Sequence, residues 1–108
     1  MKTELPGPIA AYFRAVNAHD EDGMLAPFAE GAVVEDEGKS RRGRAEIRAW
    51  IEEVTASYRP ACAILGVTGG APGVMVEGSV SGTFPGSPVR LRYAFQLAGG
   101  QITRLKIS

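Results

Sequence analysis

The chain has 108 residues, with twelve basic and twelve acidic side chains, one histidine and one cysteine. Its length fits a single domain over residues 1–108, and its 44% hydrophobic and 22% charged composition is typical of a globular protein rather than a disordered one. One cysteine excludes an intrachain disulfide and a multi-cysteine zinc site. No apolar run reaches the ~20 residues that would cross a bilayer, and the opening MKTELPGP lacks the apolar segment of a signal peptide, so we expect a cytoplasmic protein with no membrane partner.

The balanced total charge hides a split between the two halves of the chain. Residues 1–57 carry a net charge of −4, and residues 58–108 carry +4. A basic half can indicate nucleic-acid binding, but these five basic residues are scattered and no aromatic-rich basic stripe accompanies them. We therefore expect no nucleic-acid partner and interpret the split as two structural layers with different solvent faces.

The first predicted helix begins near Pro8 and ends between Asn17 and Asp20. Pro8 suits a first helical turn, where its missing N–H has no intrahelical partner to lose. Four residues fall at the i, i+3, i+4, i+7 spacing of one apolar helix face: Ile9, Tyr12, Phe13 and Val16.

A short second helix follows, and Asp20 is a suitable N-cap for it. Pro27 and Gly31 limit its length. Its apolar face consists of three residues: Met24, Leu25 and Phe28.

The next segment, Ala32 to Gly38, is predicted as a strand with an acidic end. Lys39 to Arg42 are expected to form a loop, and Gly43 with Glu46 resembles a helix start. This third helix continues to about Ser57, and its apolar positions recur at helical spacing: Ile47, Trp50, Ile51 and Val54.

From Ala61 onward the apolar pattern shortens to a period near two, which predicts strands at about 61–68, 74–83, 88–97 and 102–107. Turn-forming runs rich in glycine and proline separate them. In the strand at 88–97, one face is apolar and the other carries Arg90, Arg92 and Gln96, as expected for a sheet with one solvated face. The predicted class is therefore α+β, with helices covering one face of an antiparallel meander.

Two stretches resemble the nuclear transport factor 2-like superfamily, and within it the ketosteroid isomerase and SnoaL-like branch. They are YFRAVNAHDEDGMLAPFAEGAVVED, from Tyr12 to Asp36, and RGRAEIRAW, from Arg42 to Trp50. The resemblance implies an α+β barrel: a cone-shaped, curved antiparallel sheet wrapped around three N-terminal helices, with a pocket at its open end. The fold hosts both enzymes and non-catalytic binders, so it does not decide the activity.

The resemblance also implies three catalytic positions. The general base of ketosteroid isomerases matches Asp36, a tyrosine of their oxyanion hole matches Tyr12, and a protonated aspartate that donates to the same oxyanion is replaced here by Tyr93. Strand parity groups Asp36 with Val34, which makes Asp36 the inward acid if Val34 is buried. A one-residue register shift would exchange it for Glu35 or Glu37.

Several of the candidate residues also have a simpler, structural interpretation. Tyr12 and Tyr93 could instead be core aromatics, and Trp50 could belong to the core or to one pocket wall. His19 is expected to have a surface or capping role, and Cys62 to be a small buried hydrophobe. The expected ligand-contacting residues are Phe13, Val16, Phe28, Val34, Trp50 and Phe95.

The leading hypothesis is a small pocket enzyme that removes a proton next to a carbonyl group, as an isomerase or a polyketide cyclase of the SnoaL type would. Such an enzyme needs neither a metal nor an organic cofactor, and its ligand would be small, apolar and carbonyl-containing. Homodimerisation through the outer sheet face is expected from the resemblance. The alternative is a non-catalytic member of the same fold that binds a ligand or a protein. A third possibility is epoxide hydrolysis, but that reaction requires a network of acidic and arginine side chains, and the sequence predicts only one inward acid.

Overall fold

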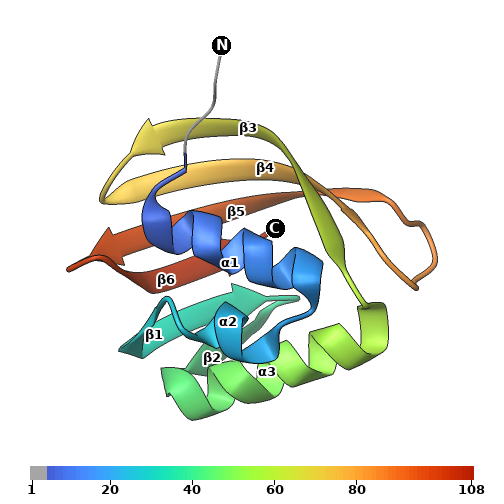
Figure 1. Ribbon diagram of the computed structural model, residues 1–108, viewed down its shortest axis with the longest axis horizontal. Coiled ribbons are helices and arrows are strands. Elements are labelled where there is room, and N and C mark those ends of the chain that lie inside the picture. Colours follow the sequence, from blue (N-terminus) through green and yellow to red (C-terminus); the bar gives the residue numbers. More distant parts are fainter. Residues whose placement is uncertain (1–4) are drawn as a thin grey trace.

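The computed structural model describes residues 5–108, so the first four residues of the expected domain lie outside the described part (Figure 1). The helices are α1 (Gly7–Ala18), α2 (Glu21–Leu25) and α3 (Gly43–Tyr58). The strands are β1 (Phe28–Asp36), β2 (Lys39–Arg42), β3 (Ala61–Gly70), β4 (Gly73–Ser81), β5 (Val89–Ala98) and β6 (Gln101–Ile107). Within residues 5–108 no helix is long and apolar enough to cross a membrane.

The six strands form one sheet in the order β2-β1-β6-β5-β4-β3. The meander from β3 to β6 is antiparallel, as expected, but β1 and β6 run parallel, with Val34 opposite Leu105. The sheet is therefore mixed, and it is not closed. Figure 1 shows it curving around α1, with α2 and α3 covering the same side, which is the expected α+β cone.

The end of α1 and the start of α2 follow the local signals in the sequence. His19 ends α1 in a left-handed conformation, and its N–H bonds to the carbonyls of Ala15 and Val16. The Asp20 side chain accepts a hydrogen bond from the N–H of Gly23 at 3.1 Å, which confirms it as the N-cap of α2. The predicted end of α2 is wrong, because the helix stops at Leu25 and Phe28, expected on its apolar face, is the first residue of β1.

The expected loop at Lys39–Arg42 is wrong, because these residues form strand β2 against β1. A two-residue turn joins the strands, with positive φ at both Glu37 (54°) and Gly38 (75°), as in the tight turns that hairpins favour. All four residues of β2 are polar or charged and none is buried, so this edge strand has no apolar alternation by which the sequence could reveal it.

The alternation of β5 is confirmed. Tyr93 and Phe95 are buried, whereas Arg90, Arg92 and Gln96 are exposed on the outer face. The basic second half of the chain thus supplies the solvated side of a sheet.

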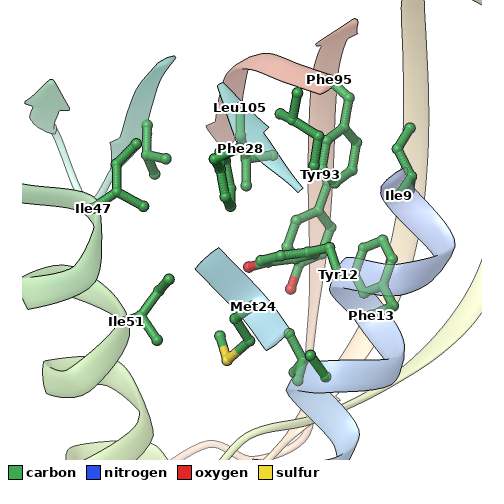
Figure 2. Packing of buried hydrophobic residues seen from close by; sticks show 14 of the residues in the cluster. Ile9, Tyr12, Phe13, Met24, Phe28, Ile47, Ile51, Tyr93, Phe95 and Leu105 are labelled. Carbon is green, nitrogen blue, oxygen red and sulfur yellow. The ribbon is translucent and has the colours of Figure 1, made fainter. Parts of the chain in front are cut away.

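Five aromatic rings form the centre of the core, between α1 and the inner sheet face (Figure 2). Most neighbouring pairs meet edge to face, with centroids 5.0–6.0 Å apart, the geometry that aromatic pairs prefer. The rings belong to Tyr12, Phe13, Phe28, Tyr93 and Phe95. Because Phe28 and Phe95 fill one end of the cone, the space left inside it lies toward the other end.

Candidate functional site

A pocket of about 390 Å³ lies inside the cone, between the helices and the inner face of the sheet. Five of the residues predicted from the sequence line it: Tyr12, Val16, Asp36, Trp50 and Tyr93. They come from α1, the end of β1, α3 and β5, so the fold brings together side chains from four elements.

Asp36 is the last residue of β1, and its side chain points into the pocket. Val34 is completely buried two residues earlier, as the parity argument required. Glu35 takes the opposite face, where it pairs with Arg104. Glu37 also lines the pocket, but its backbone belongs to the turn after the strand and the residue is exposed, which places it at the rim.

The surroundings of the Asp36 carboxylate act on its charge in opposite directions. Its burial raises its pKa above the ordinary value, and the hydrogen bond from the Trp50 indole N–H to Oδ2, at 3.0 Å, lowers it. The charge of Glu37 raises the pKa, and the guanidinium of Arg41 lowers it. The balance is an elevated pKa, which suits a carboxylate that must take up a proton.

Tyr12 and Tyr93 bring two hydroxyl groups to the same pocket. Figure 2 shows both oxygens pointing away from the packed aromatic end and toward the same region. Burial raises the pKa of both phenols far above its usual range, and the Asp36 carboxylate raises both further. Both are therefore neutral hydrogen-bond donors at neutral pH.

Four of the expected ligand-contacting residues do not line the pocket: Phe13, Phe28, Val34 and Phe95. All four are buried in the core. Periodicity identifies which face of an element points inward, but it does not tell at which height along the cone the side chain lies. The four residues belong to the buried core rather than to the pocket wall, and their contact with a ligand stays a prediction.

Sequence reasoning missed much of the wall. The missed residues from the helices and turns are Met24, Glu37, Val54, Tyr58 and Pro60. Those from the sheet and its β4–β5 connection are Val80, Phe84, Val89, Leu91 and Ile107. Val54, Val89 and Leu91 share predicted faces with Trp50 and Tyr93, so the signal for these three was present.

His19 and Cys62, together with Arg41 next to the pocket, make structural contacts. His19 Nε2 lies 3.0 Å from the Pro60 carbonyl oxygen, which ties the end of α1 to the start of β3. Cys62 is buried, and its thiol lies beside the Tyr93 hydroxyl. Arg41 donates to the backbone carbonyl of Asp36 at 3.1 Å. Across residues 5–108, no cluster of three or more histidine, cysteine or acidic side chains is arranged to hold a metal ion.

The pocket wall is mostly apolar, and the charged side chains recorded on it, Asp36 and Glu37, are both acidic. An anionic ligand would therefore meet repulsion, whereas a neutral apolar ligand would be favoured by desolvation. Two hydroxyl donors and one carboxylate then provide the specific polar contacts.

Comparison with known proteins places these features in context. A family model described as the SnoaL-like domain matches residues 9–105. The solved structure of a candidate polyketide cyclase from Sinorhizobium meliloti is 38% identical, with a TM-score of 0.91 over 96% of this chain and 95% of that one. A candidate polyketide cyclase from Xanthomonas campestris pv. campestris is 29% identical, with a TM-score of 0.73 over 94% of this chain and 86% of that one.

A third solved structure supports the fold alone. It is a protein with a ketosteroid isomerase-like fold from Catenulispora acidiphila DSM 44928, solved in complex with trimethylamine. It is 19% identical, with a TM-score of 0.84 over 97% of this chain and 86% of that one. Comparison with curated proteins gives no match.

Proposed function

The chain belongs to the SnoaL-like domain family, and from this premise we propose that it is an enzyme that abstracts a proton next to a carbonyl group. The observation that carries the proposal is that the Asp36 carboxylate and the hydroxyls of Tyr12 and Tyr93 line one mostly apolar pocket. A base and two donors in a desolvated site are the parts that enolate chemistry requires.

The proposed ligand is small, neutral and apolar, and it carries a ketone or a related carbonyl. The apolar wall provides binding through desolvation, and the acidic rim at Glu37 disfavours anions. The carbonyl oxygen would accept hydrogen bonds from Tyr12 and Tyr93, which fixes the ligand so that its α-carbon faces Asp36.

In the proposed reaction, Asp36 takes the α-proton, and the C–H bonding electrons form a carbon–carbon double bond while the carbonyl π electrons move to oxygen. Tyr12 and Tyr93 stabilise the resulting enolate without giving up their protons, because burial raises the pKa of both phenols. If the ligand is a β,γ-unsaturated ketone, the enolate is a dienolate, and return of the proton from Asp36 to its γ-carbon completes an isomerisation. Alternatively, the enolate carbon attacks a second carbonyl carbon of the same ligand, and the resulting alkoxide takes the proton back from Asp36, which completes an aldol cyclisation, as in a polyketide cyclase.

Exchange of α-protons tests this proposal without knowledge of the natural substrate. We would incubate the protein with 2-tetralone, a neutral bicyclic ketone, in D2O and follow deuterium uptake at the α-carbons by proton NMR. We expect exchange above the buffer rate and its loss by at least about a thousandfold in Asp36→Asn, since the base is removed. Glu35→Gln, the neighbouring acid on the outer face, is the matched control and should exchange like the wild type.

Exchange that is unchanged in Asp36→Asn would contradict the assignment of the base. Binding of 2-tetralone with no exchange above buffer would instead favour the alternative, a non-catalytic ligand-binding member of the fold.

We also propose that two copies of the chain associate through the outer face of β3–β5. Leu65 and Met75 are 48% and 39% exposed there, the two large hydrophobic side chains recorded as exposed in residues 5–108. Arg90 and Arg92 are exposed on the same outer face, on β5, which makes this face mixed rather than purely apolar. Light scattering should give a dimer for the wild type and a monomer for Met75→Glu, and a wild-type monomer would contradict this proposal.

A further inference from the structure

Trp50, the single tryptophan of the chain, makes a specific contact with the proposed base. Its indole Nε1–H donates to Oδ2 of Asp36 at 3.0 Å, and the residue is only 3% exposed. The bond joins α3 to the end of β1, next to the turn that connects β1 to β2. Such a contact orients the carboxylate from the wall of the pocket.

The groups that face the Asp36 carboxylate from the other elements differ from Trp50 in what they can do. Arg41, on β2, uses its guanidinium to bond the backbone carbonyl of Asp36 rather than the carboxylate. Glu37, in the turn, is an acid and repels the carboxylate charge, although its backbone N–H favours that charge. Tyr12 on α1 and Tyr93 on β5 present hydroxyls to the ligand space.

An indole N–H has chemical properties that suit this position. It donates one hydrogen bond, it carries no net charge, and it does not titrate in water. A cationic partner at hydrogen-bond distance would hold the carboxylate equally well, but it would lower the pKa by about 1–3 units and weaken the base. Because an ionised carboxylate accepts about four hydrogen bonds, the Trp50 donor leaves lone pairs free to receive a substrate proton.

We propose that Trp50 is the positioning residue for the base: its indole N–H holds the Asp36 carboxylate toward the pocket in its ionised form. The inference rests on the proposed function, since positioning matters to the reaction only if Asp36 takes the proton. It also makes Trp50 a built-in reporter, because its fluorescence should respond when the carboxylate beside its N–H gains a proton.

The first experiment is a fluorescence titration between pH 3 and pH 8, with far-UV circular dichroism to confirm that the protein stays folded. We expect a transition in the wild type and in Glu37→Gln, with its midpoint above the ordinary value of about 3.9 for an aspartate. Asp36→Asn should lack this transition. Identical titrations of the wild type and Asp36→Asn would overturn the inference.

The second experiment removes the donor in Trp50→Phe. The midpoint of the Asp36 carboxyl titration, followed by carbon-13 NMR, should rise by about one pH unit or more, because the ionised form loses a hydrogen bond. The acid limb of the 2-tetralone exchange profile should shift by the same amount. Val54→Ala, which opens space on the same wall but retains the indole, should leave the midpoint of the Asp36 titration unchanged.

These outcomes separate positioning from a merely structural role. A Trp50→Phe protein that loses stability but keeps the Asp36 midpoint would overturn the inference. If Trp50→Phe does not fold, the fluorescence titration of the wild type and Asp36→Asn decides. Exchange that survives Asp36→Asn would overturn the base itself and the inference with it, whereas a missing fluorescence transition would overturn only the role of Trp50.

Discussion

Removal of single hydroxyls from Tyr12 and Tyr93 is the most informative perturbation of the proposed oxyanion site. In Tyr12→Phe and Tyr93→Phe each ring keeps its place in the aromatic cluster, where the Tyr93 centroid lies 5.0 Å from that of Phe13. The hydroxyls face the pocket, so their loss should change the free energy of unfolding by no more than about 1 kcal/mol.

The effect on catalysis should be much larger. The pocket wall is mostly apolar, which strengthens a hydrogen bond to a developing negative charge relative to the same bond in water. Loss of one such donor costs about 100- to 1000-fold in rate in comparable sites. Because both hydroxyls are proposed to bind one oxygen, the double variant should lose less than the product of the two single losses.

The assay is α-proton exchange of 2-tetralone, with urea unfolding of each variant as the measure of stability. A rate within about threefold of the wild type in either single variant would refute the role of that hydroxyl. A double loss equal to the product of the single losses would show that the two donors act on different parts of the ligand.

Two further predictions concern pH and packing. Burial raises the pKa of Asp36 in the folded protein, so its contribution to stability is present below the unfolded value of about 3.9 and is lost as the pH rises through the folded value. The free energy of unfolding of Asp36→Asn, measured relative to the wild type by urea unfolding, should therefore be about 1 kcal/mol higher at pH 7 than at pH 3. The change is small because solvent screens the half-exposed carboxylate. The same difference between variant and wild type at both pH values would contradict this prediction. On the inner face of β4, a Cβ added at Gly78 would lie 2.6 Å from the Cys62 Sγ, so Gly78→Ala should cost about 1–3 kcal/mol. Combining it with Cys62→Ala should recover about 1 kcal/mol against the sum of the single variants, whereas strictly additive costs would contradict the close approach.

Much of the fold could be predicted because it depends on local periodicity. The apolar spacing around Trp50 marks α3, and the alternation around Tyr93 marks β5, since each pattern corresponds to one buried face. The edge strand β2 carries only polar residues and was missed. The parallel pairing of Val34 with Leu105 joins residues from opposite ends of the chain, and no local pattern encodes it.

The site could be predicted in part for the same reason. Parity indicated the inward direction of Asp36, and the face of the first helix included Tyr12. Whether an inward side chain reaches the pocket depends on how far the opposite walls fill the cone, and spacing does not reveal this for Phe28 and Phe95, which are buried in the core. The bond between Trp50 and Asp36 depends on the way α3 packs against β1, a tertiary contact that spacing does not reveal.

A ligand-bound structure tests the central claim most directly: that Asp36, Tyr12 and Tyr93 act on one ligand. The probe is 2-naphthol, the aromatic counterpart of the enol of 2-tetralone, crystallised with the wild-type protein. We expect its oxygen within about 2.5–3.0 Å of both tyrosine hydroxyls and its ring carbon next to that oxygen facing the Asp36 carboxylate. A naphthol bound outside the cone, or one whose oxygen points away from both tyrosines, would contradict the account.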